Sequence, residues 1–420
     1  MVRYNEYKDS GVKWLGEIPG HWKTIRVKSL LSERIDKSDT GMEEPLSMSQ
    51  KYGIIPTKDM DVVPNMASTF VGAKRVFKND LVLNKLKAHL GVFAISKYDG
   101  LVSPDYAVYT PNERTYLPFM EYMFHTPLYI GEFTRKATGV AIGLTRLYTN
   151  GLFAIPFLYP PLSEQQAIVS YLDDKCGKID KMLAGKQKQI ELLAEMKQRI
   201  VADAVTHGLK PNVKMKATNN ICLGDVPEHW HIMRYGTLFK LKPVKSHHCE
   251  ELLSVFLNFG VIRAAESDKR THAASEDLSK YQLVEPTDFV MNNQQAWRGS
   301  VGVSKLTGII SPAYHIFKMP NCFNPEYANY LLRSKAIVGQ FEISSRGVGS
   351  IQRTLNFNWL NNRLVPVPPI DEQQAIVAYI NERSSKIDAL TQKLQQETEA
   401  IKEYKQRLIS DVVTGQIKVC

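Results

Sequence analysis

The sequence lacks most features of a secreted, disulfide-stabilised or membrane protein. Only five of its 420 residues are cysteine, namely Cys176, Cys222, Cys249, Cys322 and Cys420. Their odd number, wide spacing and lack of any Cys-x-x-Cys pair favour a reducing compartment without disulfides. The longest apolar run, residues 151–162, contains three prolines and is far shorter than the roughly 20 residues of a membrane span. The polar N-terminus has no signal-peptide pattern, so we expect a soluble, cytoplasmic protein.

Recognisable catalytic and metal-binding motifs are also scarce. The chain contains no G-x-x-x-x-G-K-[ST] loop, no G-x-G-x-x-G after a strand, no G-x-S-x-G and no H-E-x-x-H. His247-His248-Cys249 is the densest group of metal-ligating residue types, but it has no second set of ligands at zinc spacing. We therefore expect no catalytic residue, no metal ligand and no cofactor in this chain.

Three segments approach a catalytic loop without completing it. Adenine amino-methyltransferases use an Asn/Asp/Ser-Pro-Pro-aromatic loop, and each segment here lacks the second proline: Ser103-Pro104-Asp105-Tyr106, Ser311-Pro312-Ala313-Tyr314 and Asn324-Pro325-Glu326-Tyr327. Pro104-Asp105 could also open a nuclease motif, but the required acidic-x-Lys does not follow. A proline that enters a strand or a helix explains each segment more simply.

The composition is that of a folded protein with a basic surface. Hydrophobic residues make up 44% and charged residues 23% of the chain, and the formal net charge is +10. Such a chain has enough apolar material for two or three domains. The positive charge is compatible with a nucleic-acid partner, although ligand-binding proteins can carry the same charge.

The chain is a tandem duplication with a shift of 208 residues. Leu15-Gly16-Glu17-Ile18-Pro19-Gly20-His21-Trp22 recurs at 223–230, and Pro161-Leu162-Ser163-Glu164-Gln165-Gln166-Ala167-Ile168-Val169 recurs at 369–377. About 21 of the 50 positions in 161–210 are identical to their partners, without a gap. The two ends of each copy along the sequence are alike, while the residues between them have diverged. This pattern is expected if two similar domains recognise two different ligands. Neutral drift after the duplication would also produce it.

Each copy divides into a globular part and a helical part. Residues 1–159 and 212–367 contain short apolar runs separated by Gly, Pro, Asn and Asp, with helical stretches between them, which predicts two mixed α+β domains. Residues 160–211 and 368–420 predict two long helices. The expected fold class is therefore α+β, with two homologous domains joined by an antiparallel coiled coil in a pseudo-two-fold arrangement.

A heptad-like seam runs along both predicted helices. Alternating steps of four and three residues connect its positions, polar ones included, and about 43 residues would form a rod of roughly 65 Å. The seam residues are Leu172, Ile179, Leu183, Ile190, Leu193, Ile200, Ile380, Ile387, Leu394, Ile401 and Leu408. Some seam positions hold Lys, Ser or Thr, which a two-helix pair tolerates best.

Basic and amide side chains in the loops are candidates for contact with DNA. Arg and Lys suit phosphates and guanine edges, Gln suits adenine edges, and glycine allows close approach of the backbone. In the first copy the candidates are Lys74, Arg75, Lys85, Lys87, His89, Arg135, Lys136, Gly139 and Arg146. In the second copy they are Arg263, Arg270, Gln294, Gln295, Arg298, Arg346, Gly347 and Arg353.

The repeated motifs resemble those of the DNA specificity subunits of type I restriction-modification systems. The resemblance covers essentially the whole chain. It rests on Trp14-Leu15-Gly16-Glu17-Ile18-Pro19-x-His21-Trp22 and its copy, on both Pro-Pro-x-x-Glu-Gln-Gln blocks, and on the Lys-Gln-Arg endings of both helices at 197–199 and 405–407.

The resemblance implies a function and a set of partners. Each globular half would be a target recognition domain for one half of a split, asymmetric DNA sequence, and the helices would set the distance between the half-sites. Two modification subunits with adenine-N6 methyltransferase activity, and restriction subunits with motor and nuclease activity, would assemble on the chain. S-adenosylmethionine, ATP and Mg would belong to those partners. This chain would hold no catalytic residue.

Three other interpretations fit parts of the sequence. The chain could be a coiled-coil scaffold whose domains bind proteins, an enzyme with a degenerate methyltransferase or nuclease motif, or a silent specificity subunit that folds but never assembles. A steep loss of DNA binding with added salt would distinguish a DNA-binding subunit from a protein-binding scaffold. Methyl transfer by the isolated chain would identify an enzyme.

Overall fold

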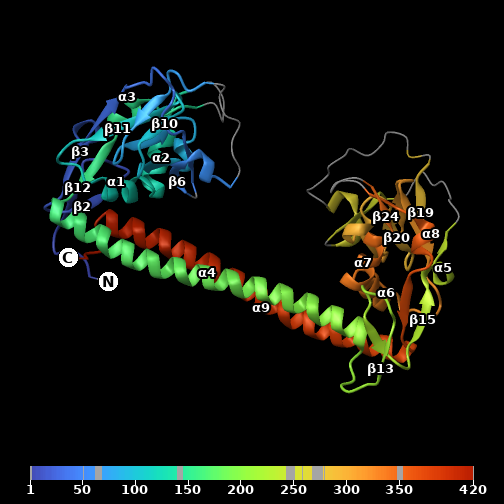
Figure 1. The fold of residues 1–420 in the computed structure, drawn as a ribbon. Coiled ribbons are helices and arrows are strands. Elements are labelled where there is room, and N and C mark those ends of the chain that lie inside the picture. Colours follow the sequence, from blue (N-terminus) through green and yellow to red (C-terminus); the bar gives the residue numbers. More distant parts are fainter. Residues whose placement is uncertain are drawn as a thin grey trace. The chain divides into compact units, whose positions relative to one another are not determined.

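A computed structural model describes residues 2–50, 52–61, 69–139, 145–242, 251–257, 259–266, 278, 280–347 and 353–419. The chain forms two compact units. The first unit comprises Met1–Gln187 with Gln396–Cys420, and the second comprises Lys188–Gln395. Two long helices, α4 (Leu162–His207) and α9 (Ile370–Val413), each contribute one segment to both units (Figure 1). The fold is mixed α+β, as expected, with two β-rich halves joined by paired long helices.

The first unit is built around a four-stranded antiparallel sheet of order β4-β11-β8-β9. Among the described residues, four two-stranded antiparallel ladders, three short helices and three 3-10 turns complete the domain. Its strands are β1 (Tyr7–Asp9), β2 (Glu17–Pro19), β3 (Lys23–Arg26), β4 (Leu31–Arg34), β5 (Leu46–Ser49), β6 (Gly53–Pro56), β7 (Lys74–Val76), β8 (Leu81–Asn84), β9 (Phe93–Ile95), β10 (Gly100–Val102), β11 (Tyr106–Pro111) and β12 (Pro156–Tyr159). Its short helices are α1 (Leu117–Phe124), α2 (Pro127–Lys136) and α3 (Thr149–Phe153), with 3-10 turns η1 (Val27–Ser29), η2 (Thr57–Asp59) and η3 (Ala88–Leu90).

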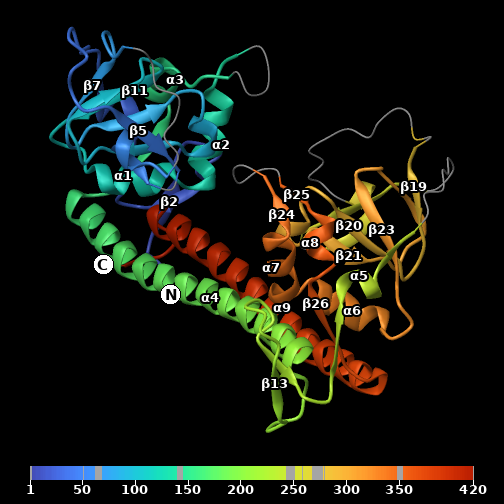
Figure 2. The same ribbon diagram turned by 45° about the vertical axis from the view of Figure 1, so that its right-hand side comes forward.

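The second unit repeats this plan with the sheet order β16-β23-β20-β21. Its strands are β13 (Met215–Ala217), β14 (Asp225–Pro227), β15 (His231–Arg234), β16 (Lys240–Leu241), β17 (Leu253–Phe256), β18 (Gly260–Arg263), β19 (Gln282–Val284), β20 (Phe289–Asn292), β21 (Val301–Val303), β22 (Gly308–Ile310), β23 (Tyr314–Lys318), β24 (Ser345–Arg346), β25 (Thr354–Leu355) and β26 (Leu364–Val367). Its short helices are α5 (Tyr235–Leu238), α6 (Pro325–Leu332), α7 (Lys335–Ile343) and α8 (Phe357–Leu360), with turns η4 (Ala264–Glu266) and η5 (Ala296–Arg298). Figure 2 shows the same elements from a second direction.

An ion pair to a buried carboxylate occurs at the same repeat position in both domains. The Arg34 guanidinium donates to both carboxylate oxygens of Asp80, at 2.9 and 3.1 Å. In the second domain Lys242 takes the place of Arg34 and lies 2.5 Å from Asp288. The Asp288 side chain also accepts from the backbone N–H of Glu285, which closes the turn before β20. Burial of a charge is tolerated only with such a partner, so the pair fixes the start of the central strand.

The segments of α4 and α9 run antiparallel within each unit. In the first unit Asp180 pairs with Lys405 at 2.6 Å, and six residues later Lys186 pairs with Glu397 at 2.5 Å. Because the partner numbers fall as the α4 numbers rise, the helices are antiparallel. In the second unit Lys197 and Asp388 pair at 2.7 Å. The lysines at seam positions therefore reach acidic groups on the other helix, which selects one register.

The apolar seam residues differ in burial along the helices. The buried members are Leu172, Ile179 and Leu408 in the first unit and Ile380, Ile387 and Leu394 in the second. Leu183, Ile190, Leu193, Ile200 and Ile401 are partly exposed. Neither long helix, nor any other described helix, is long and apolar enough to cross a membrane.

The start of each long helix is fixed to its own domain by two polar contacts. The buried amide of Gln165 donates to the Pro160 carbonyl, and that of Gln373 donates to the Pro368 carbonyl, both at 2.9 Å. One residue earlier, Glu164 lies 2.8 Å from His21. The same distance joins Glu372 and His229 in the second unit. These contacts explain why the Glu-Gln-Gln block and the His-Trp motif recur together.

The end of α9 returns to the N-terminal segment of the first unit. Gly415 terminates the helix with φ +78 and packs against Pro19 and the buried Trp22. The Tyr7 hydroxyl donates to the Gly415 carbonyl at 3.0 Å, and the Lys418 N–H donates to the carbonyl of Val2 at 2.9 Å. The first and last residues that the structure describes therefore belong to one domain.

We predict that Gly415→Ala destabilises the first unit by about 1–3 kcal/mol. A Cβ at this position would lie 2.5 Å from the Pro19 Cδ, and a positive φ is strained for alanine. Scanning calorimetry should show the unfolding transition lowered by several degrees.

Gly185→Ala is the matched control, because Gly185 lies inside α4 with open space around its Cα. This replacement should stabilise the protein by about 0.5–1 kcal/mol through helix propensity. Equal effects of the two substitutions would contradict the assigned packing of Gly415.

Candidate nucleic-acid interface

Three short elements of the second unit, η5, β24 and β25, carry or border several of the predicted contact residues. The turn η5 carries Trp297 and Arg298, and it ends at Gly299, whose φ of +97 requires glycine. The two-residue ladder of β24 and β25 pairs Arg346 with Thr354. This ladder places Arg346 and Arg353 at the two ends of the glycine-containing loop. Residues 348–352 of that loop lie outside the described residues.

Two arginines in this region lie over tryptophan rings. The Arg346 guanidinium carbon is 4.3 Å from the centre of the Trp359 ring. The Arg353 guanidinium carbon is 4.6 Å from the centre of the Trp297 ring, and Arg298 approaches the same ring at 5.7 Å. The Trp297 indole is itself held, because its N–H donates to the Gln294 carbonyl at 3.0 Å. Such contacts fix flexible guanidinium groups.

The first unit places different residues at the corresponding positions. Its turn η3 carries the partly exposed His89, and a bridge between Thr138 and Arg146 takes the place of the β24–β25 ladder. Arg146 lies 3.5 Å from Asp105, and the Leu147 N–H donates to the Lys85 carbonyl at 3.0 Å. Residues 140–144 of the predicted glycine loop lie outside the described residues, while Gly139 is exposed at the loop's edge.

Three of the predicted arginines form ion pairs with carboxylates at less than 3.0 Å. Arg75 pairs with Glu43 at 2.8 Å and with Asp36 at 3.1 Å. The Ser38 hydroxyl and then the Arg75 guanidinium lower the pKa of Glu43 to about 2. Glu43 therefore stays ionised at neutral pH and holds Arg75. The other two are Arg135, which pairs with Glu132, and Arg263, which pairs with Glu251 and Glu266.

Lys74 is the least accessible of the predicted contacts. It is 9% exposed and lies 3.7 Å from Glu33. Burial, and secondarily the charge of Lys85, lowers the pKa of the Lys74 ammonium group. This lysine is part of the domain's interior.

The remaining predicted contacts are more accessible. Among the predicted contact residues that the structure describes, those that make no ion pair with another described residue are Lys85, Lys87, Lys136, Arg298 and Arg346. Gln294 and Gly347 are exposed, and Gln295 and Arg353 are partly exposed, the latter 3.4 Å from Glu342. Arg270 lies outside the described residues.

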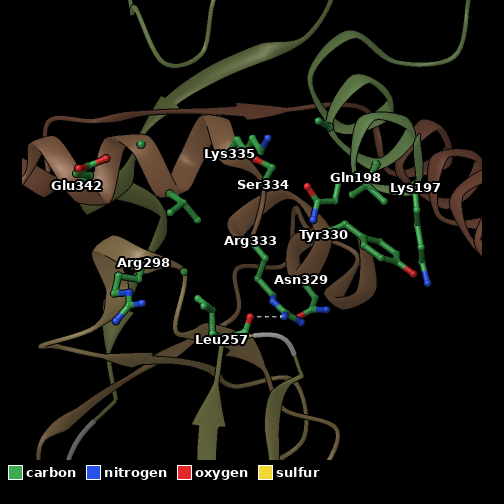
Figure 3. A pocket seen from close by; sticks show the side chains of 15 residues that line it. Lys197, Gln198, Leu257, Arg298, Asn329, Tyr330, Arg333, Ser334, Lys335 and Glu342 are labelled. Atoms are coloured by element: carbon green, nitrogen blue, oxygen red, sulfur yellow. Dashed lines mark hydrogen bonds between the residues drawn. The ribbon is translucent and has the colours of Figure 1, made fainter. Parts of the chain in front are cut away.

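A groove of about 640 Å³ lies beside the turn η5 in the second unit, and Arg298 and Gly299 line part of it (Figure 3). Val201 of α4 and Val338 of α7 contribute apolar walls, and Arg298, Arg333 and Lys335 contribute positive charge. The Arg333 side chain donates to the Leu257 carbonyl at 3.0 Å, and burial lowers the pKa of Arg333. A guanidinium nevertheless stays protonated in proteins, so the groove is cationic at neutral pH.

Sequence inspection missed Trp359, Arg333 and Lys335. The first copy has Gly151, His125 and Pro127 at these positions. The copies differ over most of the stretch between their ends, so this difference alone could not have singled out the three residues.

The near-catalytic segments have structural roles in the fold. The Ser103 hydroxyl accepts from the Asp105 N–H at 3.3 Å, in the turn before β11. The Asn324 side chain caps α6 by accepting from the N–H groups of Glu326 and Tyr327. Within the described ranges, no three or more His, Cys, Asp or Glu side chains gather in a way that could hold a metal ion. His247, His248 and Cys249 lie outside those ranges.

Comparison with known proteins supports one family. No protein-family model matches the chain. The chain is 26% identical over 302 residues to the type I restriction enzyme MjaVIII specificity subunit of Methanocaldococcus jannaschii, covering 68% of this chain and 66% of that protein. It is 22% identical over 447 aligned positions to the putative type I restriction enzyme MjaX specificity subunit of the same organism, covering 98% of each. The chain thus spans about two thirds of the first relative and nearly all of the second.

Two solved structures share the fold. One is a chain from a study of complex assembly and conformational transition in the type I R-M system, with a TM-score of 0.67 at 15% identity, covering 95% of this chain and 99% of that one. The other is the HsdS subunit from Thermoanaerobacter tengcongensis, with a TM-score of 0.52 at 14% identity, covering 97% of this chain and 100% of that one.

We predict that Arg298→Ala and Arg75→Ala differ in their effect on binding to double-stranded DNA. Each phosphate contact contributes about 0.9 to the slope of log K against log salt. Arg298→Ala should lower that slope by about this amount, because no carboxylate occupies Arg298. Arg75→Ala should leave the slope unchanged and lower the thermal stability, because Arg75 is held by Asp36 and Glu43. Anisotropy titrations at several salt concentrations measure both, and equal slopes for the two variants would contradict this assignment.

Proposed function

We propose that this chain, which belongs to the type I restriction enzyme specificity subunits, reads a DNA target in two separate parts. It is the DNA specificity subunit of a type I restriction-modification system and a non-catalytic component of that system. In the proposed arrangement each globular domain reads one half-site, and the two half-sites differ in sequence.

The observation that carries this proposal is that buried polar contacts repeat in both domains while the residues around the predicted DNA-contact loops differ. The ion pairs of Asp80 and Asp288, and the contacts of Gln165 and Gln373, repeat with the 208-residue shift. The exposed positions beside the predicted loops do not repeat. Where the second domain has Trp297, Arg346, Arg353 and Trp359, the first has His89, Thr138, Thr145 and Gly151. Two domains with the same fold and different residues beside their loops are suited to bind two different DNA sequences.

The long helices are proposed to act as the spacer. They contain 46 and 44 residues, which corresponds to roughly 65–70 Å at 1.5 Å per residue. The antiparallel ion pairs Asp180–Lys405 and Lys197–Asp388 are related by the same 208-residue shift. A single register between the two helices suits the proposed role of a spacer between the half-sites.

Exposed apolar residues on the helix pair support the docking of two copies of one partner. In the first unit Met182 and Tyr404 are 54% and 52% exposed, and the Asp180–Lys405 register places them opposite each other. In the second unit Met196 and Leu390 are 49% and 47% exposed, beside the Lys197–Asp388 pair. Met182 and Leu390 occupy one repeat position, and Met196 and Tyr404 occupy another. Exposed apolar pairs on a helical surface are typical of interaction sites.

We assign these two patches to two modification subunits. S-adenosylmethionine would bind to those subunits, and ATP and Mg would bind to the restriction subunits that join them. The chain itself would contribute sequence recognition and geometry, while the chemistry on adenine would take place in its partners.

Methylation mapping tests the recognition function. Cells that express this chain with its modification subunit should carry N6-methyladenine at one split, asymmetric motif. Cells that lack only this chain should lose that methylation. A palindromic motif would contradict the proposal of two different half-sites, and unchanged methylation would favour a scaffold or a silent subunit. Methyl transfer by the purified chain alone would instead indicate an enzyme.

Charge substitutions on the helices test the docking sites. The double substitutions Met182→Glu with Tyr404→Glu, and Met196→Glu with Leu390→Glu, should each reduce the number of bound modification subunits from two to one, as measured by native mass spectrometry. The cause is the burial of a carboxylate in an apolar contact.

Met42→Glu is the control for these variants, since Met42 is 89% exposed in the first globular domain, away from the helix pair in sequence. It should retain two bound subunits. Retention of both subunits by both double variants would place the docking surface elsewhere.

A further inference from the structure

Arg346 differs from the other arginines of the second domain in how it is held. Its guanidinium lies 4.3 Å from the centre of the Trp359 ring. It makes no ion pair with any residue that the structure describes, and Trp359 is 41% exposed. Contact with the ring occupies the flat face of the guanidinium and leaves its edges, where the N–H groups point, for a ligand.

The neighbouring Arg353 is held more completely. It lies 4.6 Å from the centre of the Trp297 ring and 3.4 Å from the Glu342 carboxylate. The Trp297 indole is fixed in turn by the Gln294 carbonyl. Arg353 therefore suits a positioning role at the base of the loop, and Arg346 suits a contact role.

The shape of a stacked guanidinium favours one base. Two parallel N–H donors match the O6 and N7 acceptors that guanine presents in the major groove, and this is the commonest specific contact between proteins and DNA. A ring that already fixes the guanidinium lowers the entropy lost on binding. A lysine could replace the charge but could not reproduce the planar pair of donors.

The first domain has no equivalent of this pair. Thr138 and Gly151 stand at the positions of Arg346 and Trp359. A residue pair that occurs in only one of two duplicated domains is suited to recognise a base that is present in only one half-site. A general phosphate contact would serve both half-sites equally.

We propose that Arg346, held by Trp359, is a specificity-determining residue that reads a guanine in the half-site bound by the second domain. This inference rests on the proposed function and adds to it one base and the residue that reads it.

The test is methylation mapping in cells that express the modification subunit with the wild-type chain, Arg346→Ala, Arg346→Lys or Trp359→Ala. The wild-type motif should contain a guanine in one half. Both Arg346 variants should methylate sites with another base at that position roughly five- to hundred-fold more, relative to the guanine site, than wild type does. The other positions of the motif should stay unchanged. Trp359→Ala should relax the same position to a smaller degree.

Arg383→Ala is the matched control, because Arg383 also lies over an aromatic ring, that of Tyr379, at 5.5 Å, but on α9. It should preserve the whole motif. Because Arg346 and Trp359 are exposed, thermal unfolding of the variants should match that of the wild type, which shows that the fold is intact.

The possible failures are distinguishable. If the wild-type chain directs no methylation to a split motif, the proposed function is wrong. If the wild-type motif is present and both Arg346 variants keep it, the proposed function stands and this inference is overturned. Uniform loss of methylation in Arg346→Ala that Arg346→Lys restores would identify a phosphate contact, which also overturns it.

Discussion

The buried amide side chains at the start of the two long helices are the constraint on which the rest of the structure depends. Gln165 and Gln373 are 1% and 0% exposed, and each has the carbonyl of a preceding proline within hydrogen-bonding distance. A buried amide without a partner is costly, so each helix can leave its domain in only one direction. The hydrogen bonds that join Glu164 to His21 and Glu372 to His229 hold the same junctions. The loops that we assign to DNA contact are oriented relative to these junctions.

Much of the architecture could be predicted from the sequence because the same pattern occurs in both copies of the duplication. The recurrence of the Glu-Gln-Gln block indicates a shared junction, and the spacing of Leu172, Ile179 and Ile380 indicates paired helices. Local signals also indicated Arg346 and Arg353, which flank a glycine-containing loop, and their contact with DNA stays a prediction. The status of Arg75 could not be predicted, because the carboxylates that hold it belong to Asp36 and Glu43, more than 30 residues earlier in the sequence. Trp359 was missed for the same reason, since only the folded chain brings it to Arg346.

The contrast between interior and surface has an energetic side. Replacements of exposed residues away from special features usually change stability by about 0.5 kcal/mol or less, whereas the loss of one partner of a buried ion pair costs several times more. The Arg34–Asp80 and Lys242–Asp288 pairs belong to the second class, and the residues around the predicted loops belong to the first. The proposed reading surface can therefore change while the frame beneath it stays folded.

The return of α9 to the N-terminal segment bears on how the protein is made. The first unit is discontinuous, since it needs residues from both ends of the chain, while the second unit is one continuous stretch. Domains generally fold as units as the chain emerges during synthesis. The domain that begins first on the ribosome must therefore wait for the last residues, because Pro19, Trp22 and Tyr7 meet Gly415 only then. The second unit needs no residue after Gln395, so its contacts can form before those between Gly415 and the first unit.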